Sequence, residues 1–346
     1  MIFRRLILVT FILFSVSAHD LLAQTNIDSL KQSKIYKSVF QKKTTDSLYI
    51  GTYSRTISVG PIYKYKTYQF IITDQWGIGN PVEFQPNVND RLGLRVQYQG
   101  FIINLHFPLP SNNHIFGKTK STYLGLSFKL PFKNWQHDFF YQNHRGFYVA
   151  NADDIIPSYV LGRPFPKRGD LRTMELGWTS KMVFSNQFSM KAAINQSEKQ
   201  LRSKGSFVLG STVLFHGFSA DSAIIPKEQI QFYKDINGLV KGRFFTFSFG
   251  PGYAYTYVFQ DFFITGMLLV NGGIQFQGYR NDGVLGKYRF GFKLNSSINY
   301  RIAGGFNLEK FYGSIVYDFQ NQHIKIKDSK ITTRLEGVNL NCGLRF

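Results

Sequence analysis

The sequence predicts an all-β protein: a transmembrane antiparallel up-and-down β-barrel with about 12 strands, in a range of roughly 12–14. The first observation is the stretch Lys287–Ala303, in which apolar residues alternate with basic or small polar ones at a period of two. The second is a series of similar stretches that continues to the last residue, Phe346. The third is an N-terminal segment typical of export. Strands of soluble domains average about 5–6 residues, so an alternation over about sixteen favours a membrane barrel.

Composition agrees with a barrel that is apolar outside and polar inside. Aromatic residues make up 17% of the chain, with 35 Phe and 20 Tyr, yet the hydrophobic fraction is only 43%. Aromatic girdles around an otherwise alternating wall produce this combination. The single cysteine, Cys342, excludes an intrachain disulfide framework and a cysteine metal cluster.

The start of the chain predicts a cleaved signal peptide. The basic pair Arg4 and Arg5 precedes the apolar run Leu6–Val16, and small residues follow as far as Ala23. We therefore expect residues 1–23 to be the signal peptide, 24–50 a short periplasmic lead-in, and 51–346 the barrel. Export without an apolar run long enough for a membrane-spanning helix favours the outer membrane of a Gram-negative bacterium.

Thirteen alternating stretches are candidates for strands, and the even number expected of a single-chain barrel makes twelve the preferred count. They are 56–72, 91–98, 101–107, 123–130, 135–147, 174–178, 188–196, 207–216, 244–257, 262–275, 287–303, 308–319 and 337–346. Short connections are expected near Gly100, Asn134, Asn186, Gln260 and Gly305. Long connections are expected at 108–119, 149–169, 218–241, 278–286 and 320–330. The alternation of short and long connections is irregular between Gln196 and Lys241, where we expect that one strand has been missed or split.

Phe346 ends the last amphipathic strand in phase with four earlier apolar positions: Val338, Leu340, Cys342 and Leu344. Such a terminal aromatic resembles the signal that the barrel assembly machinery reads, so we expect that machinery as a partner.

Two pieces of the chain, 195–210 (NQSEKQLRSKGSFVLG) and 221–226 (DSAIIP), carry a resemblance to an uncharacterised family of outer-membrane β-barrels of Bacteroidota type. The stretches 161–172 and 251–263 support it. The resemblance implies a barrel fold and an outer-membrane location, and it transfers no activity. Residues of this motif region are candidates for a functional loop: Gln196, Lys199, Lys204, Ser206, Asp221, Ser222 and Pro226.

Cations occur repeatedly on the face opposite the apolar one. The candidates for a basic lumen are Arg91, Arg95, Lys129, Lys191, Lys287, Arg289, Lys293, Arg301 and Arg345. An open lumen lined in this way would attract small anions. Alternatively, the cations pair in a filled interior with Asp138, Glu175, Glu309 and Glu336. Cations near strand ends would suit lipopolysaccharide phosphates.

No constellation typical of an enzyme is present in the sequence. The six histidines that follow the predicted signal peptide, at positions 106, 114, 137, 144, 216 and 323, lack metal-ligand spacing, and we expect no metal, no cofactor and no catalytic residue. His137 or His216 beside a serine is a minor candidate for a lipid hydrolase. The basic pI of about 9.8 does not indicate nucleic acid, because the cations are spread along strands.

The sequence thus favours a porin-like barrel that passes or binds small anionic or polar solutes through a basic lumen. The alternative is a non-conducting surface or structural barrel that binds lipopolysaccharide or a partner protein through its loops. A lipid-modifying hydrolase is the third possibility.

Overall fold

The computed structural model describes residues 45–53, 57–74, 77–98, 101–109, 120–132, 134–281 and 286–346. The unit that holds the barrel begins at Thr45. The predicted signal peptide and most of the predicted lead-in lie outside the described residues, so both stay predictions.

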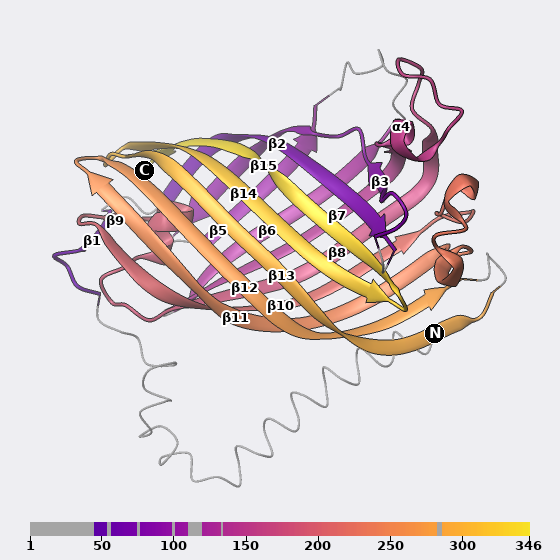
Figure 1. Cartoon of the computed structure of the whole chain (residues 1–346). Coiled ribbons are helices and arrows are strands. Elements are labelled where there is room, and N and C mark those ends of the chain that lie inside the picture. The colour runs from indigo at the N-terminus through magenta and orange to yellow at the C-terminus, as the bar shows by residue number, and fades with distance from the viewer. Residues whose placement is uncertain are drawn as a thin grey trace, which may run out of the picture. The chain divides into compact units, whose positions relative to one another are not determined.

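Long strands form the wall of the barrel (Figure 1), and each overlaps one of the predicted stretches of alternating residues. They are β2 (Ile57–Thr73), β4 (Asp90–Tyr98), β5 (Phe101–Pro108), β6 (Thr122–Phe132), β7 (Trp135–Val149), β8 (Lys167–Val183), β10 (Lys204–Ser219), β11 (Lys241–Phe259), β12 (Phe262–Arg280), β13 (Tyr288–Asn307), β14 (Phe311–Ile326) and β15 (Ser329–Arg345).

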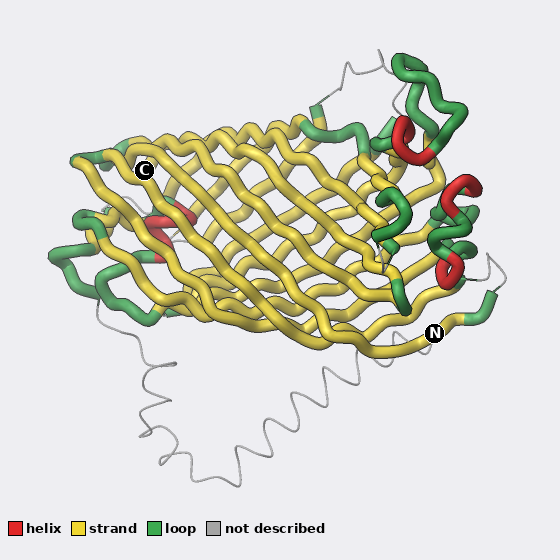
Figure 2. Tube along the Cα trace, in the orientation of Figure 1, coloured by secondary structure: helices red, strands yellow, loops and turns green. Residues whose placement is uncertain are grey.

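These twelve strands close into a ring. Figure 2 shows the strands of the wall from the side, with the connections at the two ends of the barrel. Each pairs antiparallel with its neighbours along the chain, and the pairing of β15 with β2 joins the two ends of the sheet. Phe346 completes this seam, because its backbone N–H donates to the carbonyl oxygen of Ile57 at 2.8 Å. The predicted all-β barrel and the preferred count of twelve strands are therefore confirmed.

A short thirteenth strand, β3 (Val82–Gln85), narrows one end of the ring. It pairs with Phe70–Ile72 of β2 on one side and with Tyr148 and Val149 of β7 on the other. There β3 alone bridges β2 and β7, whereas further down β4, β5 and β6 stand between them. The barrel therefore has fewer wall strands at this end.

The strands are staggered around the ring. Pairing partners followed from Phe263 of β12 once around the barrel lead back to Gln277 of the same strand, a stagger of 14 residues. Closure with such a stagger requires tilted strands, and it brings side chains that are distant in sequence to the same level of the interior.

Three sequence expectations about connections are wrong. Residues 188–196 are not a strand but part of a long connection, 184–203, that holds the π-helix η2 (Lys191–Asn195) and β9 (Glu198–Gln200). The expected short connection near Asn186 is its beginning. The expected long loop 320–330 is instead the end of β14, a tight turn at Lys327 and Asp328, and the start of β15.

The two ends of the barrel differ. At the inner end, which carries Ile57 and Phe346, the connections are short except for 184–203, and β1 (Ile50–Thr52) pairs with β9. At the outer end lie longer connections with α4 (Ala152–Ile155), η3 (Lys227–Gln229) and η4 (Lys234–Ile236), at the right of Figure 1. Short periplasmic turns and long external loops are the usual arrangement of such barrels.

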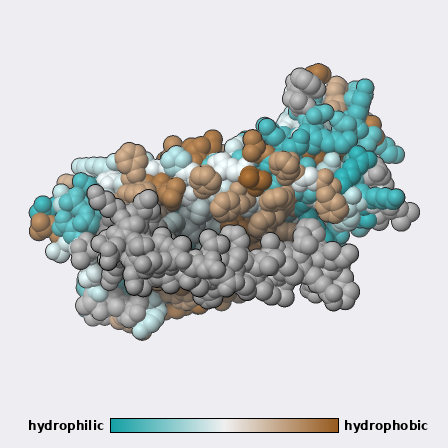
Figure 3. All heavy atoms as spheres, turned by 90° about the horizontal axis from the view of Figure 1, so that it is seen from below, coloured by the Kyte–Doolittle hydropathy of each residue, from teal (hydrophilic) through white to brown (hydrophobic). Residues whose placement is uncertain are grey.

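An apolar belt covers the outer surface of the wall. The outward positions of β11, for example, are Phe245, Phe247, Phe249, Tyr253, Tyr255 and Tyr257, all of them exposed. In Figure 3 hydrophobic side chains gather along the middle of the molecule, and hydrophilic ones dominate one end. Such a belt suits a bilayer core. No helix among the described residues is long and apolar enough to cross a membrane.

Candidate functional site

Cationic side chains from five strands point into the middle of the barrel. Because successive side chains alternate between the two faces of a strand, those at every second position of these strands face the interior. We call this region the basic chamber. Its cations are Lys64, Lys66, Arg91, Arg95, Lys129, Lys181 and Arg301.

Three acids face the same region. Asp138 accepts a hydrogen bond from Nζ of Lys181 at 2.6 Å, and Asp318 pairs with Nη1 of Arg301 at 2.9 Å. Glu175 lies 3.0 Å from Nδ1 of the buried His216 and also accepts from Gln142. Among the described residues, seven cations against three carboxylates leave an excess of four positive charges when the histidines are neutral.

The excess is concentrated on lysines. Within the described part of the chain, Lys64, Lys66 and Lys129 form no ion pair. Lys64 has Lys66, Arg95 and Lys129 as like-charged neighbours, and Asp318 as its opposite charge. Like charges held close together in the partly enclosed interior repel one another, so this arrangement favours a bound anion.

The two arginines of β4 are held by neutral partners. The guanidinium of Arg91 lies 3.7 Å from the centre of the Tyr123 ring and donates to the carbonyl oxygen of Val88. Nε of Arg95 donates to Asn104 at 3.1 Å. Stacking and neutral hydrogen bonds fix both side chains and leave their charge uncompensated.

An apolar core fills the outer end of the barrel. Inward residues of the wall, including Phe70, Phe218 and Phe244, pack there against loop residues such as Ile155 and Ile236. Tyr233 holds the loop after β10 in place, because its hydroxyl shares its one hydrogen between the carbonyl oxygens of Ile72 at 3.0 Å and Asn80 at 2.9 Å. We call this cluster the outer core; it separates the basic chamber from the outer face.

The connection 184–203 fills the inner end, and we call it, together with β1, the inner cap. Ile194 and Asn195 of η2 are buried inside the barrel, and Asn195 donates to Gln136 at 2.8 Å. Nη2 of Arg301 approaches the carbonyl oxygen of Ile194 at 3.5 Å. The inner cap therefore reaches the floor of the basic chamber.

Arg345 and Gln196 fasten the inner cap to the wall. Gln196 takes a left-handed backbone conformation with a φ of 56°, and its carbonyl oxygen accepts from Nη2 of Arg345 at 2.8 Å. The same nitrogen donates to Asn307 at 3.1 Å. Ser314 donates to the side chain of Gln196 at 2.8 Å. These bonds join the middle of a connection to the end of the last strand.

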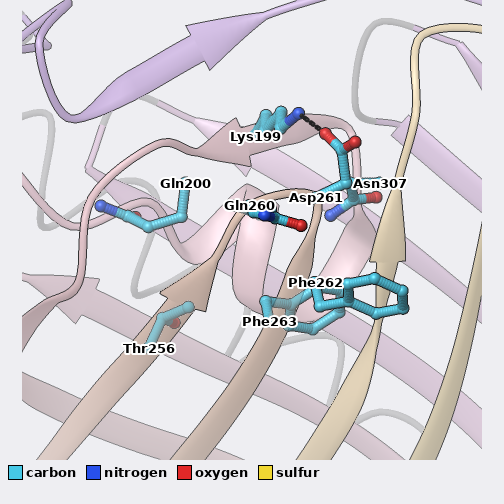
Figure 4. A pocket seen from close by; sticks show the side chains of 9 residues that line it. Lys199, Gln200, Thr256, Gln260, Asp261, Phe262, Phe263 and Asn307 are labelled. Atoms are coloured by element: carbon cyan, nitrogen blue, oxygen red, sulfur yellow. Dashed lines mark hydrogen bonds and ion pairs between the residues drawn. The ribbon is translucent and has the colours of Figure 1, made fainter.

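A small pocket lies at the rim of the inner cap (Figure 4). Lys199 and Asp261 face one another across it at 2.5 Å, and both side chains are partly exposed. Phe262 and Phe263 form its apolar side. Since its charges already pair, the pocket has little to offer a charged ligand.

The structure brings together only some of the predicted lumen cations. Arg91, Arg95, Lys129 and Arg301 line the basic chamber, and Arg345 lies at the inner cap. Lys191 is not on a strand; it belongs to η2 and pairs with Glu198 at 3.1 Å. Lys287 precedes β13, and Arg289 and Lys293 lie in its outer part, beyond the first residue paired with β14, Ser296. Those last three are at the outer end, away from the chamber.

The motif residues do not form one loop. Gln196, Lys199, Lys204 and Ser206 lie at the inner end, whereas Asp221, Ser222 and Pro226 follow β10 at the outer end. The inner group contacts the rest of the fold. Ser206, for example, accepts hydrogen bonds from the backbone N–H groups of Phe184 and Ser185. At the outer end, Arg168 contacts Ser222 and Asp170.

Sequence reasoning missed Lys64, Lys66, Lys181 and Asp318. A signal was present for the first two, since they alternate with Tyr63 and Tyr65 and share the face of buried Ile62 and Tyr68. Two acids expected inside are elsewhere. Glu336 lies on the outward face, near the Tyr317 hydroxyl, and Glu309 lies in the turn after β13.

The histidine–serine candidate is present as a contact: Nδ1 of His137 lies 2.7 Å from Oγ of Ser180, on the outward face of the wall. Ser180 is only 6% exposed, and among the described residues no carboxylate contacts His137. No group of three or more potential metal-ligating side chains occurs in the described ranges. The contact resembles an ordinary cross-strand hydrogen bond.

A family model described as a domain of unknown function, DUF4421, matches residues 44–346. The chain belongs to the DUF4421 family. The matched range begins next to the first residue of the barrel unit, so the family domain is the barrel with its inner cap. A comparison with curated proteins finds no match.

Among solved structures, the chain is similar to OmpT of Vibrio cholerae, with 8% identity and a TM-score of 0.32 over 84% of this chain and 98% of that one. It is also similar to the β domain of the Bordetella autotransporter BrkA, with 10% identity and a TM-score of 0.32 over 83% and 99%. Ail of Yersinia pestis has 11% identity and a TM-score of 0.18 over 84% and 99%. Structural similarity at this level gives no information about function.

The location follows from the chain's own architecture. A closed ring of twelve antiparallel strands leaves no unpaired sheet edge around the middle of the wall, and its outer belt is apolar. This DUF4421 protein is a β-barrel of the bacterial outer membrane.

Proposed function

We propose that this DUF4421 protein binds a small oxyanion in the basic chamber and that it is closed to free passage of solutes. The observation that carries the proposal is the excess of four positive charges in a region enclosed by the outer core and the inner cap. Buried cations without partners are costly, because desolvation outweighs any distant attraction. An anion with several oxygen atoms would accept hydrogen bonds from the lysines and offset this cost.

Closure distinguishes this proposal from a porin. The apolar outer core excludes water and ions from one end of the lumen, and the inner cap occupies the other. An anion would enter from the inner side after movement of η2, whose Asn195 donates to Gln136 and whose Ala193 and Ile194 pack in one apolar cluster with wall residues. The contacts of η2 thus support binding more than continuous passage.

The test compares the unfolding of refolded protein in sodium phosphate and in sodium chloride at equal ionic strength. Bound phosphate should stabilise the fold, by about 2.7 kcal/mol at a concentration one hundred times Kd. The variant Lys64→Gln should lose this phosphate effect. It should also be more stable than the native chain in phosphate-free buffer, because one inward cation without an ion-pair partner has gone. If Lys64 served only in packing, its replacement would not stabilise the fold.

The matched control is Lys325→Gln, which removes an outward cation of β14 at the outer end and should leave the phosphate effect intact. Undiminished phosphate stabilisation of Lys64→Gln would contradict binding in the chamber. Planar-bilayer conductance is the second measurement. A steady current through the native chain would contradict closure and restore passage as the better explanation.

A further inference from the structure

A second cluster of cations lies on the outside of the wall, at the outer end of β11, β12 and β13. Lys241, Arg243 and Arg280 occupy outward positions there, directly beyond the apolar belt. This set is separate from the basic chamber, since the chamber's side chains point inward from other positions. We call it the outer-wall patch, together with Tyr288 and the phenylalanines described next.

Strand register arranges the patch in three rows. Lys241 pairs with Arg280, which pairs with Tyr288; one row lower, Arg243 pairs with Gly278, which pairs with Phe290. The third row is Phe245, Phe276 and Phe292. Directly paired residues project from the same face of a sheet, so cations lie above a block of phenyl rings.

The rings of the patch are strongly exposed. The side chains of Phe290 and Phe292 are 71% and 70% exposed, and that of Phe276 is 56% exposed. They continue the belt formed by Phe247, Ile274 and Leu294 in the next row. Exposed apolar side chains that extend a lipid-facing belt are suited to acyl chains.

The cations of the patch lack anionic partners within the described ranges. Arg243 and Arg280 both face the ring of Tyr288, at 6.0 Å and 5.8 Å from its centre. Nε of Arg280 is buried without a hydrogen-bond partner. Two guanidinium groups around one aromatic ring form a preorganised, positively charged site.

Glycines leave room beside Arg243. Its neighbours in the same row are Gly217 of β10 and Gly278 of β12, which have no side chains. A Cβ atom on Gly278 would lie 3.0 Å from the ring of Phe290, so the ring covers this position closely. Arg243 thus has no side chain on either side of it in its own row, and the Phe290 ring lies over the position of Gly278.

We propose that the outer-wall patch binds a phosphorylated lipid of the outer leaflet. Arg243, Arg280 and Lys241 hold the phosphate, and the acyl chains lie along Phe276, Phe290 and Phe292. Arginine matches phosphate oxygens with paired hydrogen bonds, and the phenyl rows match hydrocarbon. The partner is a lipid and not a protein strand, because the cations stand at the end of the apolar belt, where lipid headgroups lie.

The experiment titrates refolded protein in detergent with lipid A and with the same lipid after enzymatic removal of its phosphates. The native chain should bind the phosphorylated form at least tenfold more tightly. Arg243→Gln combined with Arg280→Gln should lower this preference to less than twofold. Phe290→Ser combined with Phe292→Ser should weaken the binding of both lipids and leave the preference for the phosphorylated form unchanged. Inorganic phosphate up to millimolar concentrations should not compete, since it lacks acyl chains.

The matched control replaces two outward cations of β14 and β15, the next strands of the ring after β13, as Lys325→Gln with Arg334→Gln, and should bind lipid A like the native chain. Equal binding of both lipids by the native chain, or equal losses in the control and patch variants, would overturn the proposal. Full competition by inorganic phosphate would show a free-anion site instead. Lys64→Gln should not change lipid binding, so this test and that of the basic chamber fail independently.

Discussion

Replacement of Asp138 by Asn should destabilise the barrel far more than a comparable change at the rim. Asp138 accepts from Lys181 at 2.6 Å, and the two side chains are 19% and 11% exposed. Removal of its charge leaves Lys181 without a partner and raises the cation excess of the basic chamber from four to five. Breaking a buried ion pair by removing one partner costs about 3–5 kcal/mol.

The rim provides a matched control. Lys199 and Asp261 lie 2.5 Å apart, a similar distance, but their side chains are 26% and 47% exposed. Exposed pairs contribute only about 0–1 kcal/mol, because water screens both charges. Asp261→Asn should therefore change the free energy of unfolding by less than about 1 kcal/mol.

The assay is urea unfolding of the refolded chain in detergent, followed by tryptophan fluorescence and by heat modifiability on gels. The double variant Asp138→Asn/Lys181→Gln should recover part of the loss, since it removes the stranded cation as well. If Asp138→Asn and Asp261→Asn cost the same within about 1 kcal/mol, the basic chamber is water-filled and its charges are screened. The reasoning from buried charge would then be refuted.

Three further predictions concern the ends of the barrel. Burial raises the pKa of Tyr53, just outside the wall, to about 12. The fold thus favours the neutral phenol, so about 2–3 kcal/mol of stability is present below pH ~10 and is lost as the pH rises towards ~12. In unfolding curves measured at alkaline pH, the free energy of unfolding of Tyr53→Phe should decline less than that of the native chain. Tyr233→Phe should cost about 1 kcal/mol by loss of the hydroxyl's bonds to Ile72 and Asn80, and should speed proteolysis of the loop after β10; unchanged proteolysis would contradict its role in the outer core. Deletion of Phe346 removes the last two backbone bonds of the seam, both of them with Ile57, and should lower the heat-modifiable fraction in cells more than Phe346→Tyr does.

Local sequence pattern was sufficient for the wall. Alternation at a period of two assigns each side chain to a face, so Phe245 could be placed outside, and Arg91, Arg95 and Arg301 inside, without any tertiary information. It failed at 188–196, where Phe188, Met190, Ala192 and Ile194 imitate a strand. These side chains are buried in the inner cap because a folded connection also needs an apolar face.

The barrel, its outer-membrane character and the basic sign of its interior could be predicted from the residues alone, because all three depend on a two-residue repeat and on composition. Which cations have partners depends on the folded arrangement of the strands. Lys181 meets Asp138 and Arg301 meets Asp318 through strand register, whereas Lys64 meets mainly other cations. The stagger of the ring and the entry of residues 184–203 into the lumen set these neighbours. Neither the stagger nor the position of this connection can be predicted from the local alternation of residues, since both arise from contacts between residues far apart in the chain.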